Sequence, residues 1–217
     1  MKDTFIEIYT DNIKREGADK LLDWLLNSDF FEAPASTRFH LSRPGGLLEH
    51  SINVYNRLRE IYLGECERKS FGPVGLPPED EESIAICGLL HDLCKVGIYR
   101  KEPKNQKTYD TAKVAAAWKG NVKHDSMGDY IWETVMGYKH DDKLPYGHGE
   151  KSVYIISGFM RLTRDEAMAI RWHMGFSDDS FRAGSQNVGN AFALHPLAAM
   201  THMADLAATY FDEAEAK

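Results

Sequence analysis

Over most of the chain, apolar residues recur every three or four positions, which is the spacing of a helix with one buried face. Residues 18–27 show this most clearly, with four leucines on one stripe. Residues 84–90 are apolar on nearly all sides, so their helix belongs in the centre of a core. The spacing predicts helices over residues 4–15, 18–27, 47–62, 81–94, 150–160, 163–173 and 196–213.

Local signals mark where these segments begin and end. Thr163 and Glu166 have the spacing of a capping box at a helix start. Pro196 suits the first turn of the last helix, because that turn needs no hydrogen bond from its own N–H. Glycine, proline and serine cluster in three stretches that we expect to be loops or connectors, at residues 30–44, 64–80 and 175–189.

The helical spacing lapses between residues 96 and 147. Aromatic and β-branched residues there, such as Tyr109, Val122 and Tyr130, alternate loosely with polar ones. Such alternation is typical of strands with one covered face. We therefore expect an all-α helical bundle that is interrupted by a small β-hairpin excursion around residues 108–136.

Composition narrows the class of protein. The chain has 217 residues, a length typical of one domain with a sizeable core. Its 33 acidic and 26 basic residues give a net charge of −7, which argues against a general nucleic-acid coat protein with a broad basic face. No apolar run in the sequence approaches the roughly 20 residues of a membrane span, so we expect no membrane partner.

Two further signals bear on location. The first residues lack the charged-then-apolar pattern of a secretory signal. The three cysteines, Cys66, Cys87 and Cys94, have no CxxC spacing and cannot all pair within the chain. Unpaired thiols fit a reducing compartment, so we expect a cytoplasmic protein.

His91 and Asp92 stand at the end of the most apolar segment of the chain. That segment carries the pair into the interior, where a carboxylate must be paired or must coordinate a metal. Imidazole and carboxylate side by side suit Mn, Fe, Ni or Zn. The alternative is a helix end that reaches the surface and shows a polar pair to solvent.

Four more residues have side chains that suit a metal. His50 lies on the apolar side of the helix predicted over 47–62, and Asp205 lies in an apolar stretch of the last helix. His148 and His173 stand at the boundaries of predicted elements. Each of these residues, taken alone, has a structural interpretation as well as a metal-binding one.

In their order along the chain, these residues resemble the ligands of the HD-domain metal-dependent phosphohydrolase superfamily. Residues 45–51, GGLLEHS, are similar to the opening motif of many members, including the YhaM-like exoribonucleases. Residues 89–97, LLHDLCKVG, are similar to the HD signature itself. The resemblance implies a helical bundle with a metal site between helices. We expect one HD-type domain over 1–217, with its core at about 38–212 and the helices within 4–27 packed on it.

The resemblance also implies an activity and a cofactor. The activity is hydrolysis of a phosphate ester of a nucleotide or related anionic substrate by a metal-activated water, with Asp92 and Lys95 as catalytic residues. The cofactor is a divalent transition metal (Mn, Fe, Ni or Zn), one or two per chain. The implied ligands are His50, His91, Asp92 and Asp205 for a first metal and Asp92, His148 and His173 for a second.

Three residues are candidate contacts to the substrate. Lys95 follows the His-Asp pair by one turn, where its charge would face a phosphate. Arg171 precedes His173 by two residues, and its guanidinium can bind a phosphate through two parallel hydrogen bonds. His40 lies near a position where YhaM-like sequences also carry a histidine.

Residues 95–123 hold eight basic residues against two acidic ones, in contrast to the acidic chain as a whole. Tyr99, Tyr109 and Trp118 within this segment could stack on a base. We therefore expect a small anionic partner, foremost a nucleotide, with short single-stranded nucleic acid as a second possibility. The alternative is a solvated loop with a surplus of lysine.

Two other functions are compatible with the same ligands. Some members of this superfamily, such as myo-inositol oxygenase, hold two irons with a similar ligand pattern and activate oxygen. A non-catalytic module could also keep the fold and bind a metal or another ligand. Metal identity and oxygen consumption would separate the first alternative from a hydrolase, and an intact set of six ligands argues against the second.

Overall fold

The structure is a computed structural model that describes residues 1–38, 40–70 and 72–214. Three parts of the sequence predictions fall outside these described residues. They are residue 39 in the loop expected over 30–44, residue 71 in the connector expected over 64–80, and residues 215–217 at the end of the expected domain.

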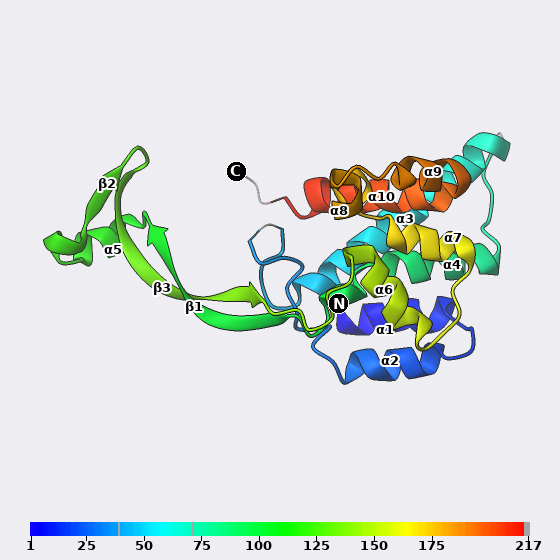
Figure 1. The fold of residues 1–217 in the computed structure, drawn as a ribbon, viewed down its shortest axis with the longest axis horizontal. Helices are drawn as coiled ribbons and strands as arrows, with labels where there is room; N and C mark the ends of the chain where they lie inside the picture. Colours follow the sequence, from blue (N-terminus) through cyan, green and yellow to red (C-terminus); the bar gives the residue numbers. More distant parts are fainter. Residues whose placement is uncertain (39, 71, 215–217) are drawn as a thin grey trace. The chain divides into compact units, whose positions relative to one another are not determined.

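The described chain divides into two compact units. The helical unit consists of Met1–Ile98 and Asp142–Lys217, and the sheet unit consists of Tyr99–Asp141. The single domain expected over 1–217 stays a prediction beside this division. Figure 1 labels the helices of the helical unit, which are α1 (Lys2–Asn12), α2 (Ala18–Leu26), α3 (Gly46–Ser70), α4 (Pro78–Leu90), α6 (His148–Ser157), α7 (Arg164–Arg171), α8 (Asp179–Arg182), α9 (Asn187–Leu194) and α10 (Pro196–Ala207).

Helix α4 lies in the centre of the helical unit, as its apolar sequence predicts. It packs against α1, α3 and α7, and its residues from Ile84 to Leu90 are all buried. Pro77 caps the start of the helix and Pro78 is its first residue. Proline is tolerated there because the N–H groups of the first turn have no hydrogen-bond partner within the helix. The helix ends at Leu90, so the next two residues, His91 and Asp92, are delivered into the interior.

Gly88 allows α3 and α4 to approach each other closely. A Cβ at this position would lie 2.5 Å from the Cα of Tyr55 on α3, which is far inside van der Waals contact. Only glycine therefore fits at this crossing. The close approach matters for the site, because His50 lies on α3 and His91 follows α4.

Helix α10 covers the other side of α3. It packs against α3, α7 and α9, and it continues into a π-helical turn, η4 (Ala208–Asp212), which also contacts α3. Leu197, Ala198, Thr201 and Ala204 form its buried face. This packing carries the acidic side chains near the end of the chain toward the middle of α3.

Most predicted helices shift by two to four residues at one or both ends, and two regions differ more from the prediction. Helix α3 extends to Ser70 instead of ending near residue 62, because a single glycine on its exposed side, Gly64, does not stop a helix. An ion pair between Glu65 and Arg68 lies on the added turn. Residues 175–189 form a 3₁₀ turn, η3 (Gly175–Ser177), then α8 and the start of α9, where a continuous loop was expected.

The sheet unit is antiparallel, with strand order β1-β3-β2. Strand β1 (Tyr99–Thr108) pairs with β3 (Gly128–His140) over its whole length, and β2 (Lys123–Asp125) pairs with the start of β3. A short helix, α5 (Thr111–Ala116), lies between β1 and β2, and the side chain of Asp110 caps it.

The prediction of an all-α bundle with a small β excursion is confirmed, but the strands extend beyond the residues 108–136 that were expected. Strand β1 alone adds residues 99–107. Its sequence, YRKEPKNQKT, shows no apolar alternation because the strand is exposed over nearly its whole length. Within the described residues, no helix has both the length and the apolar character that a membrane span requires.

Candidate metal centre

The six predicted metal ligands lie together in the helical unit. Asp92 and the rings of His50, His91 and His173 are almost completely buried, and Asp205 is largely buried. The group draws on α3, the turn after α4, the first residue of α6, the turn after α7 and α10. Overlapping subsets place one donor atom each within 4.8 Å of the others: His50, His91 and Asp205; His91, Asp92 and His173; Asp92, Cys94 and His148.

Two of the rings are fixed by the ends of their own helices. The Nδ1 of His91 donates to the carbonyl oxygen of Gly88 at 2.9 Å, and the Nδ1 of His173 donates to that of Ile170 at 2.7 Å. In each case the acceptor lies three residues earlier and belongs to the last turn of a helix. The Nε2 of each ring faces the centre of the cluster and is an acceptor whenever the ring is neutral.

His50 is held by acidic residues from the end of the chain. Its Nδ1 lies 3.0 Å from Oε1 of Glu213, and its Nε2 lies 3.2 Å from Oδ1 of Asp205. Its Nε2 also lies 3.3 Å from the Nε2 of His91. Two ring nitrogens at this distance need a proton or a cation between them, because two lone pairs repel each other.

Asp92 lies at the centre of the cluster. Its Oδ1 is 2.8 Å from Nε2 of His148 and 3.5 Å from Nε2 of His173. Its Oδ2 is 3.5 Å from Nε2 of both His50 and His91 and 2.5 Å from Nζ of Lys95. Each carboxylate oxygen thus faces a different pair of imidazoles.

The charges of the cluster suit a cation. Burial opposes ionisation of Asp92 and Asp205, but the surrounding cations and histidines outweigh it and hold the pKa of both carboxyl groups well below the ordinary value. Burial lowers the pKa of His91 to about 3 and also lowers the pKa of His148. Ionised carboxylates and neutral imidazoles are the forms that bind metals.

At His173, burial lowers the pKa of the ring, but contacts with Asp92 outweigh burial and raise it. His50 also differs from His91 and His148. Burial lowers its pKa, but the hydrogen bonds to Asp205 and Glu213 outweigh burial and raise the pKa to about 9. A proton on His50 can therefore occupy the gap between the two facing ring nitrogens. A divalent cation would satisfy the same gap with more charge.

The donor set fits a divalent metal. The Nε2 of His173 is buried and has no hydrogen-bond partner among the described residues. Buried polar atoms are rarely left in this state, so the atom indicates a missing ligand. Nitrogen and carboxylate donors together suit Mn, Fe, Ni or Zn, and this combination of donors is compatible with all four metals.

Two residues of the cluster were not expected from the sequence. Glu213 is buried and bonds His50, yet it stands in an acidic stretch at the end of the chain, which reads as a solvated tail. Its spacing of eight residues from Asp205, close to two helical turns, was the available signal. Cys94 is buried with its Sγ 3.4 Å from Nδ1 of His148, and its place two residues after Asp92 was the signal there.

A second layer supports the rings. The Nδ1 of His202 donates to the carbonyl oxygen of His173 at 2.7 Å. Gly175 makes room for the His202 ring: its φ is +53°, and a Cβ there would lie 2.4 Å from the ring. The ring of His40 lies beside that of His50, with centroids 5.0 Å apart.

Arg171 is held by partners within the protein. Its guanidinium donates to Glu150, Asp178 and Ser180, at 2.9 Å in each case. The side chain is also stacked on Trp172 and is largely buried. These contacts hold Arg171 against the segment that ends in His173, and its role as a substrate contact stays a prediction.

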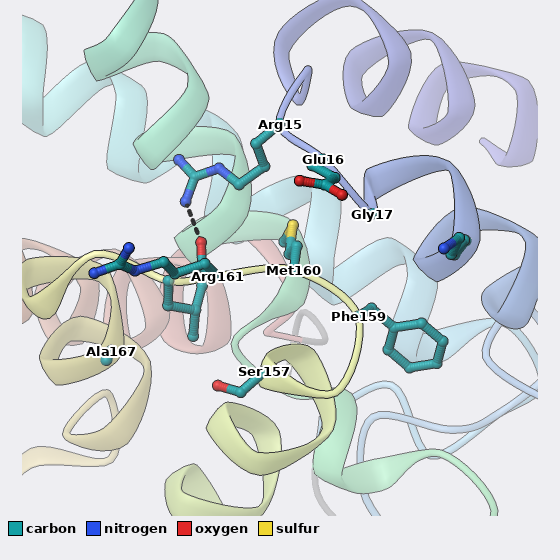
Figure 2. A pocket seen from close by; sticks show the side chains of 10 residues that line it. Arg15, Glu16, Gly17, Ser157, Phe159, Met160, Arg161 and Ala167 are labelled. Carbon is teal, nitrogen blue, oxygen red and sulfur yellow. Dashed lines mark hydrogen bonds between the residues drawn. The ribbon is translucent and has the colours of Figure 1, made fainter.

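A separate hollow of about 580 Å³ lies where the turn between α1 and α2 meets the segment between α6 and α7 (Figure 2). Figure 2 shows Arg15 at its edge, where the guanidinium donates to the carbonyl oxygen of Arg161 at 3.0 Å. None of its lining residues belongs to the metal cluster. This hollow and the metal cluster are therefore in different places.

Comparison with known families agrees with this geometry. A family model described as HD domain matches residues 47–215, which is most of the chain and includes all six predicted ligands. No curated protein and no solved structure matched the chain.

Proposed function

Because this chain belongs to the HD domain family, whose members are mostly metal-dependent phosphohydrolases, we propose that it hydrolyses a phosphate ester of a nucleotide or a related anionic compound. Such a reaction needs an activated water and a stabilised negative charge on the phosphoryl oxygens. Divalent cations supply both when they are bound in the cluster. The other tasks fall to residues of the chain itself.

The common orientation of three buried histidines carries the proposal. His50, His91 and His173 each engage Nδ1 with an acceptor of the protein and turn Nε2 toward the centre. Of the three, His173 shows the need for a ligand most directly, because its buried Nε2 has no hydrogen-bond partner among the described residues, whereas buried polar atoms are usually satisfied. The proposed ligands are His50, His91, Asp92 and Asp205 for one cation and Asp92, His148 and His173 for a second.

Asp92 suits the shared position between two cations. Its two oxygens face different imidazoles, with Oδ1 at 2.8 Å from His148 and Oδ2 at 3.5 Å from His50. Lys95 holds Oδ2 at 2.5 Å and keeps the carboxylate ionised. An ammonium has three N–H donors, so this contact is compatible with a second hydrogen bond from Lys95 to a phosphoryl oxygen.

The exposure of the side chains indicates the direction from which substrate approaches. The side chain of His148 is 34% exposed, whereas those of His50, His91, Asp92 and His173 are 3% exposed or less. The His148 side of the cluster therefore faces solvent. We propose Lys95 and His40, whose side chains are 12% and 18% exposed, as contacts to the substrate near the entrance.

The first test is metal content, measured by elemental analysis on protein purified without chelator or added metal. We expect one or two divalent transition metals per chain. The second test is hydrolysis of bis-p-nitrophenyl phosphate and of a panel of nucleotides after reconstitution with Mn, Ni, Zn or Fe. We expect turnover that chelation abolishes and that metal restores.

Other outcomes would contradict the proposal. Two irons per chain with oxygen uptake and no phosphate release would indicate an oxygenase. A protein that takes up no metal after reconstitution, while its helix content is intact, would be an HD fold that binds some other ligand. Hydrolysis that persists in excess chelator would mean that the cluster is not the active site.

A further inference from the structure

The two faces of the β1–β3 ribbon carry different chemistry. In an antiparallel pair, directly opposed residues project to the same face, and the faces alternate along the strand. The register runs from Tyr99 opposite His140 to Thr108 opposite Ile131. Every second pair therefore defines one face, which we call the aromatic face: Tyr99 with His140, Lys101 with Tyr138, Pro103 with Met136, Asn105 with Thr134 and Lys107 with Trp132.

The same side continues past the ribbon. Strand β2 places Lys123 opposite Tyr130, which has the same parity as Trp132. The rings of Tyr130 and Trp132 are 6.1 Å apart, and Tyr109 packs beside Tyr130 at 5.7 Å. Aromatic residues thus recur along this side of the sheet.

Most acidic residues of the strands lie on the face opposite the aromatic face. The two carboxylates among the paired positions of β1 and β3, Glu102 and Glu133, lie on the opposite face. There they are paired with Lys139 and Lys113. The aromatic face has one carboxylate, Asp125 of β2, which is neutralised by its contacts with Lys107 and Tyr109.

Cations flank the rings of the aromatic face. The Nζ of Lys107 lies 4.1 Å from the ring centroid of Tyr130, and that of Lys101 lies 5.8 Å from that of Tyr138. Trp132 and Met136 are 51% and 62% exposed, although side chains of this kind are usually covered. Tyr130 is buried beneath this face, whereas Trp132 is exposed and Tyr138 is partly exposed. Exposed rings with lysines beside them on a sheet can stack on bases while the ammonium groups contact phosphates.

Charge separates the sheet unit from the rest of the chain. Residues 99–141 contain eight Lys and Arg against six Asp and Glu, which gives this unit a net charge of +2. The whole chain has a net charge of −7, so the remaining residues carry −9. A polyanion would therefore be attracted to the sheet unit and repelled by the remainder.

We propose that the aromatic face of the sheet unit binds single-stranded nucleic acid. Its exposed rings would stack on the bases, and Lys101 would contact a phosphate. This binding site goes beyond the proposed phosphohydrolase function and does not depend on it, because it rests on residues of the sheet unit alone. Single strands are favoured over a duplex, since stacked and paired bases hide the surfaces that the rings would use.

The first experiment measures fluorescence anisotropy of labelled dT12, rU12 and a 12-base-pair duplex with the full-length protein. We expect single strands to bind at least tenfold more tightly than the duplex, and the ratio of dT12 to rU12 identifies which polymer is preferred. The double variant Trp132→Ala/Tyr138→Ala should weaken single-strand binding at least tenfold. Val135→Ala, on the opposite face of the same strand, is the matched control and should change binding less than twofold.

A second pair of variants tests the charges without removing any aromatic ring. Lys101→Gln and Lys104→Gln remove the same charge from the same strand, on the aromatic face and on the opposite face respectively. Each phosphate contact contributes about 0.7 to the slope of log affinity against log salt for a single strand. We expect Lys101→Gln to lower the magnitude of this slope by about 0.7 and Lys104→Gln to leave it unchanged.

Several results would overturn the proposal. One is equal loss of binding in the two lysine variants, which would indicate a diffuse charge effect. Another is tighter binding to vesicles that contain anionic lipid than to any single strand. A third is loss of oligonucleotide binding when chelator removes the metal, since binding would then reside in the cluster. If the proposed phosphohydrolase activity fails while dT12 or rU12 binding persists, only the function of the metal centre is wrong.

Discussion

Each histidine ring in the buried cluster has one nitrogen that is bound to an acceptor of the protein, and this bond decides what the other nitrogen can do. Backbone carbonyls hold His91 and His173, whereas a carboxylate, Glu213, holds His50. A carboxylate partner makes an imidazole a stronger ligand and fixes its orientation. Glu213 is therefore a positioning residue for His50.

Glu213→Gln tests that role at the residue scale. The amide keeps the volume but loses the charge, so we expect metal affinity to fall about 10- to 100-fold. Isothermal titration with Zn²⁺ or Mn²⁺ measures it. Asp212→Asn is the matched control, because Asp212 pairs with Arg57 away from the cluster, and its affinity should be unchanged. Equal losses in both variants would show a general charge effect.

Asp92→Ala removes the carboxylate that every proposed ligand histidine approaches. We expect loss of most bound metal and of measurable hydrolysis, while helix content by circular dichroism stays close to that of the unchanged protein. Elemental analysis and phosphate release provide the two readouts. Full turnover in this variant would mean that the site is assigned to the wrong residues.

Lys95→Ala separates a substrate contact from a structural one. We expect turnover to fall roughly 100-fold, since one charged donor to the developing charge is lost. Metal content should change little, because Lys95 contacts Asp92 and supplies no metal-binding atom. Lys95→Arg keeps the charge and should retain more activity. Loss of metal together with turnover would make Lys95 a support of the cluster.

At the scale of single elements, the contact between α3 and α4 sets the distance between His50 and His91. Gly88 is the point of closest approach, and its missing side chain is what lets the two helices meet. Helix α4 has no polar face that would allow it to shift outward, because its residues from Ile84 onward are buried. The spacing of the two histidines is thus a consequence of helix packing.

Gly88→Ala and Gly64→Ala form a matched pair for this contact. The first places a methyl group against Tyr55, and overpacking of this kind costs about 1–3 kcal/mol of unfolding free energy. The second is on α3 with nothing within 4 Å, so alanine should raise the unfolding free energy by about 0.5–1 kcal/mol. Urea unfolding followed by circular dichroism measures both. A neutral Gly88→Ala would show that the helices can separate without loss.

The sequence predicts helices and strands best where one face of the element, or the whole element, is buried. The capping box at Thr163 and Glu166 is present as expected, and the apolar run before His91 is a central helix. Strand β1 was missed because an exposed ribbon needs no apolar alternation. Glu213 was missed because it stands in an acidic stretch, and its partner His50 is 163 residues away in the sequence.

At the scale of the whole molecule, one buried carboxylate connects distant parts of the helical unit. Glu166 accepts from Arg15 at 2.7 Å, from Ser83 at 2.7 Å and from the backbone of Thr163 at 2.8 Å. These partners lie after α1, in α4 and at the start of α7. Burial raises the pKa of Glu166, but the hydrogen bonds outweigh burial and hold its pKa below the ordinary value.

This depressed pKa predicts a loss of stability in acid. The unfolded chain takes up a proton at Glu166 near pH 4.3 and the folded chain only at lower pH, so the contribution is complete above about pH 4.3. It is lost as the pH falls through the folded value. Glu166→Gln should lower the unfolding free energy by about 3 kcal/mol at pH 7 and by less at pH 3. Urea unfolding at both pH values checks this, and an equal deficit at both would contradict it.

The pairing of Tyr99 with His140 means that the chain leaves the helical unit and returns to it at neighbouring points. The sheet unit is therefore an insertion whose two ends meet, placed in the sequence between Lys95 and His148. Such an insertion can grow or shrink by two pairs of residues at a time, and each such step keeps the same side chains on the same face. Descendants of this chain could thus alter what the ribbon recognises by small steps, while the histidines and aspartates of the helical unit are inherited unchanged.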